Sequence, residues 1–174
     1  MIKYVYALIG LLLWVSPVTA EPLSQKARAA TAVLYTQSLD GGMRMLCTAT
    51  VFEAFVRDAR PGYLLATAAH CVAMDDIVKQ KVLVSGGSFF ISFDWPEDKI
   101  FHPVHVEAAG YQSRGDDFAV LHVYTEEDWT VLEVGDMSKV EVTEDVLNVA
   151  APMGLGLQVI TGHISLISLA RPVK

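Results

Sequence analysis

The chain has 174 residues, of which 52% are hydrophobic and 19% are charged, and its mean hydropathy is +0.37. This composition excludes an intrinsically disordered protein, because disordered chains are poor in apolar residues and rich in net charge. The length is that of one domain, and a formal charge of −7 leaves no basic surface for a phosphate backbone, which argues against nucleic acid as a partner.

Residues 1–20 have the pattern of a secretory signal peptide. An apolar run from Tyr4 to Val15 follows Lys3, and Val18-Thr19-Ala20 forms a small-residue cleavage site. The run is shorter than the ~20 residues that a membrane-spanning helix needs, although an uncleaved N-terminal anchor is the alternative. We therefore expect residues 21–174 to form an exported protein, secreted or periplasmic, with no membrane contact after cleavage.

From Ala29 onward, short runs rich in β-branched and aromatic residues alternate with Gly, Pro, Asp and Asn, which is typical of β-strands separated by turns. The predicted strands are Thr31 to Gln37, Leu46 to Phe55, Tyr63 to Thr67, Lys81 to Val84, Phe89 to Phe93, Val104 to Ala108, Phe118 to Tyr124, Val146 to Ala150 and Leu157 to Ile164. This pattern predicts an all-β barrel or sandwich.

Glycine pairs predict two tight hairpins, one at Asp40-Gly41-Gly42 and one at Ser85-Gly86-Gly87-Ser88, because such turns need positive φ angles. One helical turn is expected at Ala68 to Ala73. The acidic stretch Thr125 to Asp128 is interpreted as a solvated loop.

The two cysteines, Cys47 and Cys71, are the only possible disulfide pair in the chain. An exported protein meets compartments that are oxidising enough for a disulfide to persist. Two buried free thiols, or half of a metal site, are the alternatives.

The most informative segment is Thr67-Ala68-Ala69-His70-Cys71, in which a strand ends at a single histidine beside a cysteine. It resembles the motif that carries the general-base histidine of the trypsin-like (chymotrypsin-fold) serine peptidases. In that family the cysteine after the histidine pairs with one on an earlier strand, where this chain has Cys47. The alternative for His70 is a histidine satisfied within the core.

A second resemblance lies at Gly115-Asp116-Asp117-Phe118, directly before a predicted strand. The family's Asp-Ile-Ala-Leu-Leu motif implies that Asp117 orients His70 from a buried place at the barrel rim and fixes the imidazole tautomer. The segments Ala151 to Leu157 and Gly162 to Ser165 resemble the start of the second barrel in bacterial members of the kind that includes the HtrA proteases.

The family's nucleophile lies in a Gly-x-Ser-Gly-Gly loop, and no such sequence occurs in these 174 residues. The resemblance thus implies a chymotrypsin-like double β-barrel with a complete N-terminal barrel (about 29–125) and a second barrel only begun (about 140–174). We expect a truncated serine endopeptidase with His70 and Asp117 as catalytic residues. The alternatives are an inactive pseudopeptidase that binds peptides or proteins, and an exported β-barrel without peptidase ancestry, in which His70 and Asp117 would lie far apart.

The remaining candidates carry less weight. Ser85 and Ser88 flank glycines but lie in the first barrel, and Ser165 and Ser168 lie in the final strand region, so none is expected to replace the missing nucleophile. His102 and His105 are interpreted as surface residues, because two histidines without a matched ligand do not make a zinc site. No cofactor is expected, no loop favours calcium, and the expected partner is a polypeptide substrate.

Overall fold

The computed structural model describes residues 22–38, 40–75, 81–83, 88–93, 100–110, 115–152 and 156–165. In chain order its elements are α1 (Leu23–Ala29), β1 (Thr31–Gln37), β2 (Met43–Arg57), β3 (Arg60–Thr67), the 3₁₀ helix η1 (Ala69–Cys71), β4 (Ala73–Asp75), β5 (Lys81–Leu83), β6 (Phe89–Ser92), β7 (His102–Ala109), β8 (Ala119–Tyr124), the 3₁₀ helix η4 (Met137–Lys139), β9 (Asp145–Ala150) and β10 (Gln158–His163). The predicted leader, residues 1–20, lies outside the described residues. Within them, no helix has both the length and the apolar character needed to cross a lipid bilayer.

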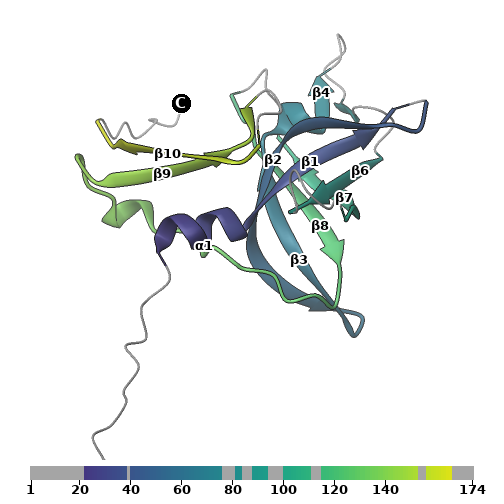
Figure 1. Ribbon diagram of the computed structural model, residues 1–174, viewed down its shortest axis with the longest axis horizontal. Helices are drawn as coiled ribbons and strands as arrows, with labels where there is room; N and C mark the ends of the chain where they lie inside the picture. Colours follow the sequence, from purple (N-terminus) through teal and green to yellow (C-terminus); the bar gives the residue numbers. More distant parts are fainter. Residues whose placement is uncertain are drawn as a thin grey trace, which may run out of the picture.

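A closed barrel of six antiparallel strands forms the body of the molecule, in the order β1-β2-β3-β8-β7-β6 (Figure 1). The barrel closes where β1 pairs with β6, from Val33 opposite Ser92 to Thr36 opposite Phe89. Each barrel strand therefore has a hydrogen-bonded neighbour on both sides. The structure confirms the predicted all-β barrel.

Side chains alternate between the barrel interior and its outer surface, as the period of a β-strand requires. Along β8, Ala119, Leu121 and Val123 are buried, and the residues between them are only partly covered. Inward-facing residues of the other strands pack with these three residues to form one apolar core. This core includes Leu34, Val51, Leu65, Phe89, Ile91 and Val104. Strand β1 is buried on both faces, since six of its seven residues are buried.

Every predicted strand is present, with ends that differ by a few residues. The predicted helical turn is η1, which covers Ala69–Cys71. Three elements were not predicted: α1 has a single buried residue, Ala27, so its sequence lacks an apolar stripe, and β4 and η4 have only three residues each.

One hairpin prediction is confirmed and the other is wrong. Asp40-Gly41-Gly42 joins the paired strands β1 and β2, and Gly41 has a φ of +83°. By contrast, β5 and β6 do not pair with each other: β5 pairs with β4, and both edges of β6 are occupied by β1 and β7. The residues Gly86 and Gly87 themselves lie outside the described residues.

The chain after β8 covers one end of the barrel and then leaves it. The Trp129 indole stacks on Tyr63 at a ring-centroid distance of 5.0 Å and meets Phe93 at 4.8 Å. The predicted solvated loop at 126–128 is exposed. Farther on, β9 and β10 form a two-stranded sheet that projects beside the barrel, with α1 alongside β9 (Figure 1).

Candidate active site

His70 lies in the short 3₁₀ helix that follows β3, at the rim of the barrel. Its neighbours Ala69 and Cys71 are buried, whereas 56% of the His70 side chain is exposed. The strand is anchored just before this turn by Thr67, whose hydroxyl donates a hydrogen bond of 2.8 Å to the Thr48 carbonyl on β2. Small residues on both sides of His70 thus let the backbone turn tightly and present the imidazole to solvent.

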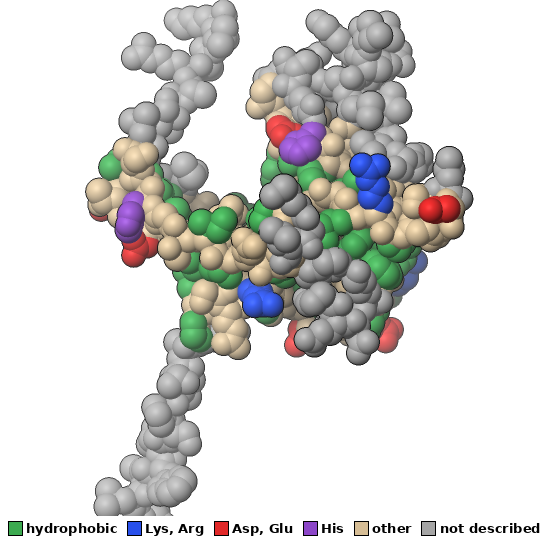
Figure 2. Space-filling model, turned by 45° about the horizontal axis from the view of Figure 1, so that its top comes forward, with side chains coloured by type: hydrophobic (Ala, Val, Ile, Leu, Met, Phe, Trp, Pro, Cys, Tyr) green, Lys and Arg blue, Asp and Glu red, His purple; other side chains and the backbone are tan. Residues whose placement is uncertain are grey.

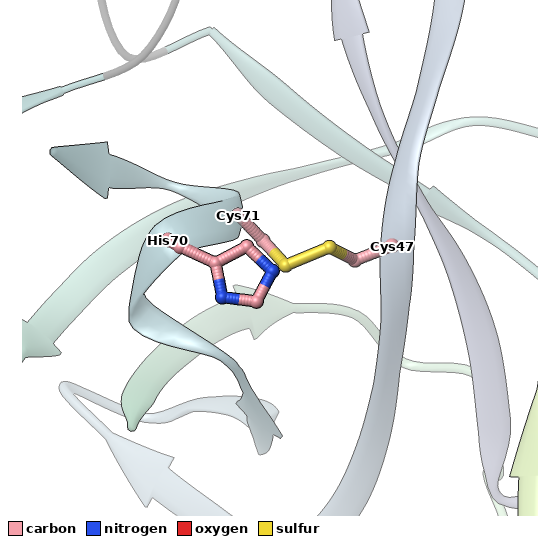
Figure 3. A group of neighbouring side chains, drawn as sticks. All are labelled: Cys47, His70 and Cys71. Carbon is pink, nitrogen blue, oxygen red and sulfur yellow. A yellow bond between two sulfur atoms is a disulfide. The ribbon is translucent and has the colours of Figure 1, made fainter. Parts of the chain in front are cut away.

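A disulfide between Cys47 and Cys71 attaches this turn to strand β2 (Figure 3). The two Cα atoms are 6.1 Å apart and the cysteines are separated by 24 positions in the chain. The predicted disulfide is therefore present, and the alternative of two free thiols is wrong. Because the bond joins the residue after His70 to the barrel wall, it limits how far the imidazole can move.

Asp117 lies directly against His70, although 47 positions separate the two residues. Its Oδ2 is 2.7 Å from His70 Nδ1, and its Oδ1 accepts a hydrogen bond of 2.9 Å from the His70 backbone N–H. The alternative of an exported β-barrel without peptidase ancestry predicts that these groups lie far apart, and they do not. The carboxylate is not buried as expected, since 43% of the Asp117 side chain is exposed.

The two hydrogen bonds determine the electrostatics of the pair. They lower the pKa of Asp117, first through the His70 backbone N–H and then through the imidazole, and partial desolvation opposes them. An ionised carboxylate has only acceptor atoms, so the proton of a neutral His70 ring belongs on Nδ1. His70 Nε2 is then an unprotonated nitrogen, which is the form that a general base needs.

Gly110 allows the loop that carries Asp117 to approach the end of β7. Its backbone N–H donates a hydrogen bond of 2.7 Å to the Phe118 carbonyl. A Cβ atom at this position would overlap the Asp116 carbonyl oxygen and would lie 2.6 Å from Asp116 Cγ. The close approach therefore depends on the absence of a side chain, and it holds the backbone on both sides of Asp117.

A cleft of about 410 Å³ opens beside His70, between the barrel and β9. Thr48, Ala66 and Ala68 belong to its barrel side, together with the disulfide. Residues 148–152, from the end of β9 and just beyond it, form the opposite side. The β9 residues carry no local sequence signal for the site, although the resemblance of the segment from Ala151 onward points to this region.

The other candidates from the sequence do not join this site. His102 is half-buried against Trp129, at a ring-centroid distance of 5.0 Å, so its interpretation as a surface residue is wrong. His105 is exposed, as expected, and packs against His122. Ser88 and Ser165 are exposed, whereas Ser85 and Ser168 lie outside the described residues. Within the described residues, no serine or threonine hydroxyl forms a hydrogen bond with the His70 imidazole.

Figure 2 shows that histidine and acidic side chains meet at two separate places on one face of the molecule. The exposed pairs of this kind are His70 with Asp117 and His163 with Asp145, the latter 2.6 Å apart on the β9–β10 hairpin. Only the first pair lies beside the cleft and the disulfide. A hydrogen bond between a histidine and a carboxylate therefore does not by itself mark the candidate site. The neighbouring cleft and disulfide distinguish the His70–Asp117 pair from the His163–Asp145 pair.

Comparison with known proteins gives a likeness in structure only. No family model and no curated protein sequence matches the chain. Among solved structures, the HtrA-type protease AlgW with a decapeptide superposes with a TM-score of 0.57 at 16% identity, over 81% of this chain and 43% of that chain. AlgW with a tripeptide gives 0.54 at 18% identity, over 83% of this chain and 40% of that one.

The serine endoprotease from Yersinia pestis is similar to the same degree, with a TM-score of 0.56 at 16% identity over 84% of this chain and 46% of that chain. This chain thus spans less than half the length of those solved chains. At such low identity the likeness identifies the fold and not the activity. The chain has the fold of the trypsin-like serine peptidases.

Proposed function

We propose that this chain carries the general base and the orienting acid of a serine-type endopeptidase. The observation that supports the proposal is the 2.7 Å contact between His70 Nδ1 and Asp117 Oδ2 beside an open cleft, in a chain with the trypsin-like fold. In this proposal, His70 Nε2 removes the proton from a serine hydroxyl and later gives it to the leaving amine. Asp117 holds the ring and stabilises the imidazolium between these steps.

A serine-type peptidase also needs a nucleophilic serine, which His70 and Asp117 do not supply. The 174-residue sequence has no Gly-x-Ser-Gly-Gly, whose serine would attack the carbonyl and whose backbone N–H groups would hold the oxyanion. We therefore propose that this chain alone does not form an acyl-enzyme. His70 and Asp117 would act on a serine that lies in another stretch of polypeptide.

We propose an unfolded or extended polypeptide as the substrate. The cleft beside His70 is open, and one of its sides is the edge region of β9, where an extended chain can lie. The AlgW structures with the same fold hold a decapeptide or a tripeptide, which is consistent with this substrate class. Export from the cytoplasm belongs to the same proposal, because residues 1–20 resemble a leader and the Cys47–Cys71 disulfide needs an oxidising compartment.

A fluorophosphonate probe, which labels activated serines, tests the proposal in two steps. The purified 174-residue chain is expected to give neither labelling nor cleavage of an unfolded protein substrate. The DNA that follows the codon for Lys174 is then examined for an in-frame Gly-x-Ser-Gly-Gly. If it encodes one, the longer product should be labelled, and either His70→Ala or Asp117→Asn should slow labelling about 10⁴-fold.

His163→Ala is the matched control, because it removes the other exposed histidine that contacts a carboxylate, and it should leave labelling unchanged. Equal labelling of the His70→Ala protein would contradict the proposed role of the pair. A downstream region without the motif, together with a folded chain that binds polypeptides without cutting them, would instead support the pseudopeptidase alternative.

A further inference from the structure

The disulfide and the candidate base form one compact group of potential metal ligands. Ligand atoms of Cys47, His70 and Cys71 all lie within 4.8 Å of one another, and Figure 3 shows an edge of the imidazole turned toward the sulfurs. Within the described part of the chain this is the one group of three such side chains. In the disulfide form the sulfurs are bonded to each other, so they are not thiolate ligands.

We propose that the reduced protein binds a zinc ion through Cys47 Sγ, Cys71 Sγ and a ring nitrogen of His70. Reduction by a dithiol breaks the S–S bond: the dithiol gives up two electrons and two protons, becomes a disulfide, and leaves two cysteine thiols. Zinc then displaces the two thiol protons to solvent and binds both thiolates. The two thiolate charges neutralise the dication, so no unbalanced charge is left beside the buried Cys71 and the half-buried Cys47.

The distances suit a tetrahedral zinc ion. Zinc binds thiolate at about 2.3 Å and imidazole at about 2.0–2.1 Å, which places neighbouring ligand atoms roughly 3.5–3.8 Å apart. The present ligand atoms already lie within 4.8 Å of one another. Since the Cα atoms of the cysteines are 6.1 Å apart, the released sulfurs can reach this separation by side-chain rotation.

Asp117 prepares His70 for this role. It holds the Nδ1 side of the imidazole at 2.7 Å, which leaves Nε2 as the nitrogen with a free lone pair. A carboxylate bonded to the far nitrogen of a ligating histidine is the usual outer partner at zinc sites, where it fixes the tautomer and raises the basicity of the ligand. The hydrogen bond that would make His70 a base therefore also makes it a ligand.

The cleft provides access and a fourth ligand. All three side chains border the opening of about 410 Å³, so an ion can enter from solvent and keep a water molecule in its open position. If the proposed peptidase function holds, the bound ion occupies Nε2 and prevents general-base catalysis. Metal binding itself does not depend on that function, so the two proposals can fail separately.

The test uses cobalt(II) as a spectroscopic substitute for zinc. The full chain is reduced with a phosphine, which has no thiol to compete for the metal, and its fold is checked by near-ultraviolet circular dichroism. We expect one equivalent of cobalt to give thiolate-to-cobalt charge-transfer absorption and the strong visible bands of tetrahedral coordination. Added zinc should abolish these bands, and the oxidised chain should not produce them.

Variants separate the three ligands and their orienting partner. His70→Ala should weaken cobalt binding at least about tenfold, and Asp117→Asn should weaken it about 10- to 100-fold. His163→Ala, which removes the histidine paired with Asp145 away from any sulfur, should bind as the unaltered chain does. The double variant Cys47→Ser/Cys71→Ser should show no charge-transfer absorption.

Three results would overturn the proposal. One is a reduced chain that keeps its fold but binds no cobalt. Another is equal affinity in the His70→Ala variant, which would show that the cysteines bind without the imidazole. The third is a reduced chain that unfolds and does not recover its near-ultraviolet signal when zinc is added, because the site requires the folded barrel.

Discussion

His70 and Asp117 show how two exposed residues can be held in one geometry. Neither side chain is buried, yet Asp117 contacts both the backbone N–H and the ring of His70. The double contact orients the carboxylate and the imidazole relative to each other. An exposed ion pair with a single contact, by contrast, contributes little to the stability of the fold. The position of His70 is further limited by the disulfide at the next residue.

Tyr35 is the residue for which the structure predicts a pH effect on stability. It is 2% exposed, and burial raises its pKa from an ordinary value of 10.0 to about 12. The folded state therefore favours the neutral phenol, so stability is full below pH 10 and falls as the pH rises toward 12. Between pH 9 and pH 11 the free energy of unfolding should fall by about 1 kcal/mol because of Tyr35 alone.

Urea unfolding at pH 9 and at pH 11 measures this effect. Other groups also titrate there, so the comparison is between the unaltered chain and Tyr35→Phe, which keeps the ring and removes the ionisable hydroxyl. The Phe variant should lose less stability than the unaltered chain on going to the higher pH. Equal losses in the Tyr35→Phe chain and the unaltered chain would contradict the prediction.

At the scale of elements, the site depends on where strands end. His70 follows the end of β3 and Asp117 precedes the start of β8, and these two strands are antiparallel neighbours from Gly62 opposite Tyr124 to Thr67 opposite Ala119. Antiparallel pairing brings the end of one strand to the start of the other, so both residues reach the same rim of the barrel. This pairing is the structural reason for the 2.7 Å contact.

Gly110 offers a test of that arrangement. In Gly110→Ala the new methyl group would overlap the Asp116 backbone, so the loop must shift. We expect this shift to move the Asp117 carboxylate away from His70. We expect a loss of about 1–3 kcal/mol in the free energy of unfolding, as for other overpacked sites. We also expect the NMR signal of the hydrogen-bonded Nδ1 proton of His70 to disappear.

Gly135→Ala is the matched control, because a Cβ atom there would meet nothing within 4 Å. Its stability should stay within about 0.5 kcal/mol of the unaltered chain, and the His70 proton signal should be retained. If Gly110→Ala also leaves both readouts unchanged, the loop can adapt and Gly110 does not position Asp117.

On the scale of the whole molecule, one covalent bond joins the candidate site to the barrel. The Cys47–Cys71 bond links β2 to η1 across 24 positions of the chain. In the chain-entropy model, closing a loop of this size stabilises the fold by roughly 3–4 kcal/mol, because the unfolded chain has fewer conformations. The remaining barrel contacts are noncovalent and form as one apolar core.

The double variant Cys47→Ala/Cys71→Ala should therefore lower the free energy of unfolding by roughly 3–4 kcal/mol in urea titrations. The unaltered chain with a reductant, in metal-free buffer, serves as the control and should show a loss of similar size. A loss below about 1 kcal/mol in both samples would mean that the loop is already restricted in the unfolded state.

The sequence by itself determined the strands, the disulfide and the identity of the candidate base. Short runs rich in β-branched and aromatic residues identify β1 and β8 without reference to any other segment. The cysteine pairing follows from there being only two cysteines, and the local motif singles out His70. The strands and the histidine motif depend on residues that are neighbours along the chain, and two cysteines can pair in only one way. For that reason they can be recognised before the fold is known.

Only the tertiary structure decided which strands pair and what surrounds His70. The glycine pair before β6 favoured a local hairpin, but β6 instead pairs with β1 and β7 and so closes the barrel. Segments that are distant in sequence likewise form the cleft beside β9 and pack His102 on Trp129. They also determine how much of Asp117 is exposed. Such contacts have no local signal, because packing and hydrogen bonding across the folded chain create them.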